Sequence, residues 1–132
     1  MKNNKLKILD GQFSIHRISP DIVIPPQVYK SDFYSIVKTD DEVSIVCDSS
    51  IELRSEESNI GWTCFKFVGT LDFSLTGVLS RISSILADSK ISIFALSTYN
   101  TDYILVESQN ILETKKALIE SGYIFYEGKD NE

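Results

Sequence analysis

The chain has 132 residues, the usual size for one domain or for two small subdomains that share a core. Hydrophobic residues make up 42% and charged residues 24%, which is enough apolar material for a packed core. The formal net charge is −6 and no cluster of Lys and Arg is present, so nucleic acid is a poor candidate partner. No apolar run approaches the roughly 20 residues that span a bilayer. We therefore expect a cytoplasmic protein with no signal peptide and no membrane partner.

Residues that commonly carry metal or redox chemistry are few. Cys47 and Cys64 each lie in an apolar, strand-like run without CxxC spacing, which predicts two buried thiols that act as small hydrophobic side chains. The single histidine, His16, falls in an alternating strand pattern. A metal site would need several ligands at compatible spacing, so neither a metal nor another cofactor is expected.

The first half of the chain is typical of β structure. The apolar run 6–9 is followed by Asp10-Gly11, a pair that favours a tight hairpin turn into a second strand beginning near Phe13. Residues 33–38 and 43–47 predict another hairpin.

The connections in this half are less regular. Prolines 20, 25 and 26 mark an irregular connection, because proline lacks the hydrogen-bond donor of a central strand. Val28 and Tyr29 allow at most a single helical turn, and the polar, acidic residues 48–61 predict a linker.

The second half changes its hydrophobic period. Residues 62–68 predict a strand that ends at Gly69. Asp72 and Ser74 are both candidate N-caps, because their side-chain oxygens can accept hydrogen bonds from the first turn of a helix. Six apolar residues then share one face at helical spacing: Leu75, Val78, Leu79, Ile82, Ile85 and Leu86.

The remaining elements complete a known arrangement. Residues 91–98 and 103–106 predict strands, and Asn110 with Glu113 has the spacing of a capping box at the start of a second helix. That helix is expected to stop at Gly122, before a last strand at 123–126. The order is β-α-β-β-α-β, which predicts an α+β, ferredoxin-like module with both helices on one face of a four-stranded antiparallel sheet.

Two polar segments are expected to meet at one edge of this sheet. The turn 70–77 offers backbone N–H groups at a helix N-terminus, which suit a carboxylate. The segment 97–102 offers hydroxyls, an amide and the carboxylate of Asp102, which suit an ammonium group. Together they could hold both ends of an α-amino acid. On the residues alone a structural interpretation competes, in which Asp72 and Ser74 serve only as caps and 98–102 is only a polar turn.

The string from Ile91 to Val106 resembles the signature of ACT domains related to the C-terminal regulatory domains of aspartokinase. It is most similar to a group of small bacterial ACT-domain proteins and to the ACT modules of the CASTOR arginine sensor. The segment 72–79 fits the ligand-facing loop and first helix of that family, and many members carry glycine at the position of Lys90. The segments 9–13 and 33–36 resemble the degenerate first ACT-like unit of the same small proteins.

This resemblance implies a regulatory, amino-acid-binding role with the ligand held between two ACT units. It implies a degenerate, mostly β ACT-like subdomain at 1–58 and an ACT domain at 59–132. Asp102 would be the partner of the ligand's ammonium group. Carried over by position, the ligand-binding residues would be Asp72, Phe73, Leu75, Thr76 and Gly77 from the loop, and Thr98, Tyr99, Thr101 and Asp102 from the strand side.

Three functions fit these features to different degrees. The first is a non-catalytic module that senses a small amino acid. The second is an interaction module with a vestigial ligand site that forms a homodimer by pairing ACT units. The third, an enzyme, is the least supported, because no Ser–His–acid set, glycine-rich phosphate loop or metal cluster is visible.

Overall fold

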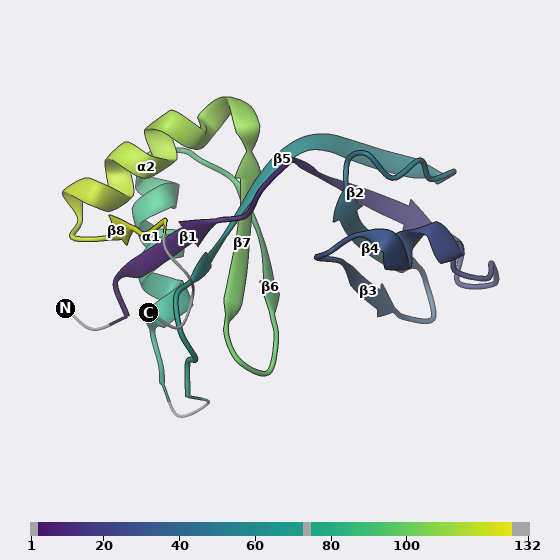
Figure 1. Ribbon diagram of the computed structural model, residues 1–132, viewed down its shortest axis with the longest axis horizontal. Coiled ribbons are helices and arrows are strands. Elements are labelled where there is room, and N and C mark those ends of the chain that lie inside the picture. Colours follow the sequence, from purple (N-terminus) through teal and green to yellow (C-terminus); the bar gives the residue numbers. More distant parts are fainter. Residues whose placement is uncertain (1–2, 73–74, 128–132) are drawn as a thin grey trace. The chain divides into compact units, whose positions relative to one another are not determined.

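The computed structural model describes residues 3–72 and 75–127 (Figure 1). The chain divides into two compact units. Residues 11–62 form one unit, here called the β unit; residues 3–10 and the described residues from 63 onward form the other, here called the α/β unit. In chain order the elements are β1 (Lys5–Ile8), β2 (Phe13–Ile18), η1 (Pro26–Lys30), β3 (Ser35–Lys38), β4 (Val43–Asp48), β5 (Glu57–Phe67), α1 (Val78–Asp88), β6 (Ile93–Ser97), β7 (Asp102–Glu107), η2 (Ser108–Asn110), α2 (Ile111–Glu120) and β8 (Ile124–Phe125).

The β unit is a small antiparallel sheet with strand order β3-β4-β2-β5. The predicted hairpin of β3 and β4 is confirmed, and its turn is closed by the Thr39 N–H, which donates to the Glu42 carbonyl at 2.9 Å. The single predicted helical turn is the 3₁₀ turn η1. The core of the unit consists of Ile18, Val28, Val43, Ile45 and Cys47.

Two expectations for the first half are wrong. Gly11 does take a positive φ of 80°, but β1 forms no hairpin with β2 and pairs instead with β5 and β8. The linker expected at 48–61 ends early, because β5 already begins at Glu57. The first residues of β5 pair with β2 through their backbones, which needs no apolar side chain, so hydrophobic pattern could not reveal them.

The α/β unit confirms the predicted β-α-β-β-α-β order but has one strand more than expected. Its strand order is β6-β7-β5-β1-β8. β1 lies between β5 and β8, antiparallel to the first through Leu6↔Phe67 and parallel to the second through Leu6↔Phe125. Leu6 is fully buried there, so inserting β1 adds an apolar residue to the centre of the core.

Both helices cover the same face of this sheet, as predicted (Figure 1). Alternate residues of a strand share a face, and the strand members of the core keep that alternation. No helix in the described part of the chain is long and apolar enough to cross a membrane. The core of this unit consists of Leu6, Phe65, Phe67, Ile82, Leu86, Ile91, Ile104, Val106, Leu118 and Tyr123.

The two cysteines are free and buried, as predicted. Burial raises the pKa of Cys64 to about 12, and burial followed by the charge of Asp48 raises the pKa of Cys47. Both groups therefore stay protonated at neutral pH and lack the thiolate that a nucleophile needs. His16 is also buried; its Nδ1 lies 3.0 Å from the Ser55 hydroxyl, and burial lowers its pKa, which favours the neutral ring.

The start of α1 differs from the prediction. The helix begins at Val78, and its N-cap is Gly77, which has a φ of 77° and provides no side-chain cap. Leu75 therefore precedes the helix, and the Asp72 backbone carbonyl accepts from the Leu75 N–H at 3.0 Å. Ser74 lies outside the described residues. The left-handed conformation of Gly77 separates this turn from the helix, although the apolar spacing runs through both.

The start of α2 is placed as expected, but the expected capping box does not form. Asn110 is the N-cap, and its side chain makes no capping hydrogen bond. The 3₁₀ turn η2 leads directly into the helix, and the buried Thr114 hydroxyl donates to the Asn110 carbonyl at 2.8 Å. Gly122 follows the end of α2 with a φ of 102°, as predicted.

Lys90 ends α1 in the way that Gly122 ends α2. Its φ is 59°, its N–H donates to the Ala87 carbonyl at 2.9 Å, and the Ile91 N–H donates to the Leu86 carbonyl at 2.9 Å. This is the Schellman arrangement, in which glycine is the usual residue at the left-handed position. A lysine therefore occupies a backbone conformation that disfavours any residue with a Cβ.

Lys90→Gly is expected to raise the free energy of unfolding by roughly 0.5–1 kcal/mol. The left-handed conformation costs a non-glycine residue about 1–2 kcal/mol, which the glycine variant avoids. The greater freedom of glycine in the unfolded chain lowers this gain in stability by about 0.5–1 kcal/mol. Urea unfolding measures the difference. Lys90→Ala is the control, because alanine keeps the Cβ and should bring no gain; an equal gain in both variants would show that the lysine charge is the cause.

Candidate functional site

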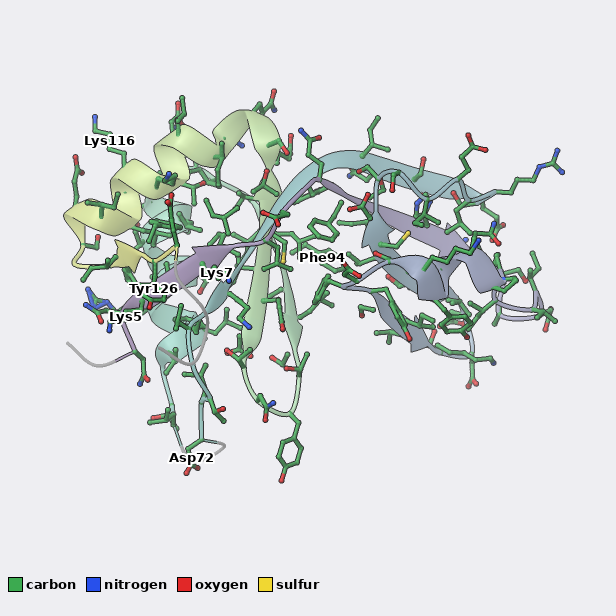
Figure 2. All side chains as sticks on the ribbon, viewed as in Figure 1. Lys5, Lys7, Asp72, Phe94, Lys116 and Tyr126 are labelled. Carbon is green, nitrogen blue, oxygen red and sulfur yellow. The ribbon has the colours of Figure 1, made fainter. Side chains whose placement is uncertain are left out.

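A cavity of about 280 Å³ lies in the α/β unit between the start of α1 and the turn that joins β6 to β7. Pockets for small molecules generally measure roughly 300–1,000 Å³, so this one suits a ligand at the small end of the range. Figure 2 shows Asp72 at the outer end of the loop that follows β5. The lining consists of Leu71, Asp72, Leu75, Gly77, Val78, Leu79, Ser80, Ser97, Thr98, Tyr99, Thr101 and Asp102.

Hydrogen bonds hold the two sides of the cavity together. The Leu71 N–H donates to the Asn100 carbonyl at 2.6 Å, which ties the loop after β5 to the β6–β7 turn. The Thr101 hydroxyl, in a buried residue, donates to the Phe67 carbonyl at the end of β5 at 3.5 Å. The segments 70–77 and 97–102, which were predicted from the sequence to converge, therefore meet through backbone groups as well as side chains.

The β6–β7 turn is shaped by two of the predicted site residues. The Thr98 N–H and the Thr98 hydroxyl both donate to the Thr101 carbonyl, at 2.8 and 3.1 Å. The Thr98 Oγ1 also accepts from the Thr101 N–H at 3.3 Å. These contacts fix the turn in one conformation and place Tyr99, 80% exposed, at its tip beside the cavity.

Asp102 begins β7 directly opposite Ser97, the last residue of β6. The Ser97 hydroxyl donates to Asp102 Oδ1 at 2.6 Å, a short hydrogen bond that orients the carboxylate. A carboxylate has about four lone-pair sites on its two oxygens, so this contact leaves room to accept further hydrogen bonds from a ligand.

The opposite wall is the first turn of α1. The first intrahelical hydrogen bond runs from the Arg81 N–H to the Gly77 carbonyl at 2.9 Å. The backbone N–H groups of residues 78–80 therefore come before the first intrahelical hydrogen bond. Groups in this position, together with the helix dipole, attract an anion. A Cβ added to Gly77 would meet no heavy atom of the described residues within 4 Å.

The charged side chains among the described lining residues are those of Asp72 and Asp102, and both are acidic. A cationic group is therefore favoured on the Asp102 side, opposite the anion-attracting start of α1. Within residues 3–72 and 75–127, no three or more His, Cys, Asp or Glu side chains gather in a way that could hold a metal ion.

Most of the residues expected at the site from the sequence line this cavity; Thr76 does not, and Phe73 lies outside the described residues. The residues carried over by position did not include Leu71, Val78, Leu79, Ser80 or Ser97, although Leu71 and Ser97 belong to the two segments that were expected to converge. A helix start assigned at Gly77 would have moved the anion-attracting turn to residues 78–80 and so included Ser80. The expected residues that line it are Asp72, Leu75, Gly77, Thr98, Tyr99, Thr101 and Asp102.

Comparison with known proteins gives matches along most of the chain. A family model for the ACT domain matches residues 57–120, and a second model, for an N-terminal domain, matches residues 11–51. The human protein CASTOR3P is 33% identical over an alignment of 92 residues that covers 60% of this chain. The chain spans 56% of the length of that human relative.

Solved structures give the same picture of the fold. Protein Atu0741 from Agrobacterium tumefaciens is 36% identical, with a TM-score of 0.85 and coverage of 95% of both chains. The regulatory subunit of aspartate kinase from Thermus thermophilus is 12% identical with a TM-score of 0.60, covering 85% of this chain and 93% of that one. Aspartate kinase from Clostridium acetobutylicum is 14% identical with a TM-score of 0.63, covering 88% of this chain and 33% of that one.

Proposed function

Because the chain belongs to the ACT-domain family, we propose that it is a non-catalytic regulatory protein that binds a small amino acid in the cavity between α1 and the β6–β7 turn. One observation carries this proposal: the cavity has the anion-attracting first turn of α1 on one side and the Asp102 carboxylate on the other. An α-amino acid carries the two complementary charges on one carbon.

In this arrangement the backbone N–H groups of residues 78–80 receive the ligand carboxylate, and Asp102 receives the ammonium group. Ser97 holds Asp102 in position through its 2.6 Å hydrogen bond. The ligand side chain then lies against Leu71 and Leu75, apolar residues of the cavity wall.

A binding role fits the lining better than a catalytic one. The described lining residues include no His, Cys or Lys, so the cavity offers hydroxyls and carboxylates without an evident base to activate a nucleophile. A cytoplasmic regulator of this kind would act on another protein differently with and without its bound ligand.

A thermal-shift screen of the full chain against the twenty amino acids tests the proposal. A ligand that binds only the folded state at a hundred times its dissociation constant adds about 2.7 kcal/mol of stability. We expect one amino acid, or a few of related size, to raise the melting temperature at millimolar concentration. No shift with any of the twenty would favour the interaction module with a vestigial site.

We also propose that two copies pair through β6. In the described part of the α/β unit β6 pairs with β7 alone, which makes it an edge strand. An edge presents unpaired backbone groups that can add a strand from another copy. Light scattering at about 100 μM is expected to give a dimer mass, with slow hydrogen exchange along β6; a monomer with fast exchange in β6 would contradict it.

A further inference from the structure

Residues 49–56 form a segment without regular secondary structure that packs on the core of the β unit. Its residues alternate in exposure: residues 51, 53 and 55 are half-buried, whereas residues 52, 54 and 56 are exposed. The half-buried Ile51 and Leu53 pack against the core of the unit. We call this segment the strap, because one of its sides lies on the core and the other faces water.

Two polar contacts join the strap to β2, one at each end. Ser14 and His16 are alternate residues of this strand and therefore share a face, and they are only 4% and 7% exposed. The Ser14 Oγ lies 3.0 Å from the Ser49 Oγ, and the His16 Nδ1 lies 3.0 Å from the Ser55 Oγ. The apolar residues of the strap lie between these contacts, so His16 holds the end of the strap that leads into β5.

The second nitrogen of the His16 ring is left without a partner. Nε2 is buried and makes no hydrogen bond within the part of the chain that the structure describes. A neutral imidazole has one N–H and one bare nitrogen, so its N–H can bond to Ser55 while Nε2 carries no proton. A protonated ring has two N–H groups, and the second would be buried without an acceptor. The surroundings of His16 therefore suit the neutral ring and disfavour the cation.

The residues beside His16 on the neighbouring strands are uncharged. Its cross-strand neighbours are Ile45 on β4 and Ser58 on β5. Cys47 is the titratable residue on the same face of β4. Burial, followed by the charge of Asp48, raises the pKa of this thiol, so it stays neutral in acid. A positive charge on His16 would thus gain nothing from these two strands.

The charged groups of the surrounding elements lie on exposed surfaces or on the other face of the sheet. In the strap they are residues 52, 54 and 56, and in η1 the titratable residues are Tyr29 and Lys30, all exposed. Arg17 and Glu57 are paired across β2 and β5 and lie on the opposite face from His16, because neighbouring residues of a strand alternate. Burial is therefore the cause that lowers the pKa of His16.

Acid is expected to weaken the part of the fold that needs the neutral ring. The pKa of His16 lies below its ordinary value of 6.5 in the folded chain, so a chain in which the ring is exposed takes up a proton more readily. The stability that the neutral ring contributes is present above about pH 6.5 and is lost as the pH falls through the pKa of the folded chain.

We propose that the strap is a pH-sensitive element of the β unit, held against β2 while His16 is neutral and released when His16 is protonated. Release exposes Ile51 and Leu53 and opens one side of the core of the β unit. The α/β unit has a core of its own and keeps it. The inference is independent of amino-acid binding in the cavity beside α1.

A proton NMR titration of the full chain measures the protonation of the ring directly. His16 is the single histidine of the sequence, so the imidazole signals belong to it alone. We expect the signal of the folded chain to titrate below pH 6.5 and that of the urea-unfolded chain near 6.5. A folded-state midpoint at or above 6.5 would overturn the proposal.

Hydrogen exchange of the full chain, corrected for the effect of pH on intrinsic exchange, locates the response. From about pH 7.5 to about pH 5.5 we expect residues 49–56 to exchange at least about threefold faster, within the roughly tenfold per pH unit that one proton can supply. The exchange of α1 and α2 should not change. No change in the strap, or an equal change in both units, would contradict release of the strap.

Two substitutions to glutamine separate the ring from the carboxylates. His16→Gln removes the titrating ring and is expected to abolish the acid response of the strap. Glu52→Gln removes a carboxylate from the exposed side of the same strap and should retain the full response. Each variant is compared with itself at the two pH values, so a lower overall stability of His16→Gln does not affect the result. A response that survives in His16→Gln, or that disappears in Glu52→Gln, would assign it to another group.

Discussion

Asp102→Asn is expected to abolish the thermal shift produced by the bound amino acid while the melting temperature without ligand stays nearly unchanged. At a hundred times the dissociation constant the lost stabilisation is about 2.7 kcal/mol. Asparagine has nearly the shape of aspartate and its Oδ1 can still accept from the Ser97 hydroxyl, so the β6–β7 turn keeps its hydrogen bond. The negative charge that holds an ammonium group is gone, and an amide NH₂ group cannot replace it.

The control for this variant is Asp40→Asn, which makes the same chemical change at an exposed turn of the β unit. It should retain the full shift. Two results would contradict the assignment of Asp102. A large fall in the melting temperature without ligand would make Asp102 a structural residue, and an undiminished shift would place the ammonium group elsewhere.

Leu118→Ala is expected to lower the free energy of unfolding by about 2–5 kcal/mol, a large part of the roughly 5–15 kcal/mol that stabilises a typical domain. Leu118 is fully buried and packs where α2 meets the sheet. Its truncation removes apolar contacts and leaves a cavity between the helix and the strands. Guanidinium unfolding followed by circular dichroism measures the loss.

Leu112→Ala provides the matched control on the same helix. Leu112 is 78% exposed, so the same truncation there should change the free energy of unfolding by no more than about 0.5 kcal/mol. Similar losses at both positions would mean that α2 does not pack on the sheet through Leu118.

Much of the lining of the candidate site could be predicted from the sequence because local pattern carries the information. The polar run around Thr98 and Asp102 stands between two apolar strands, which places it in a turn at a sheet edge. The helical spacing after Gly77 places a helix N-terminus opposite that turn. What failed was the exact start of α1: apolar spacing continues back to Leu75, and only the backbone conformation of Gly77 interrupts it.

The sequence alone also determined the β-α-β-β-α-β order of the elements from β5 onward and the face that α1 buries, because hydrophobic period depends on neighbouring residues only. The tertiary structure decided which strands pair. β1 joins β5 and β8 through backbone hydrogen bonds, which are the same for every residue type and leave no local signal. The position of β1 between β5 and β8 therefore could not be predicted from the sequence. The loop that lines the cavity beside α1 consists of consecutive residues and could be predicted from the sequence. The neighbours of β1 are distant in the sequence and are found only in the tertiary structure.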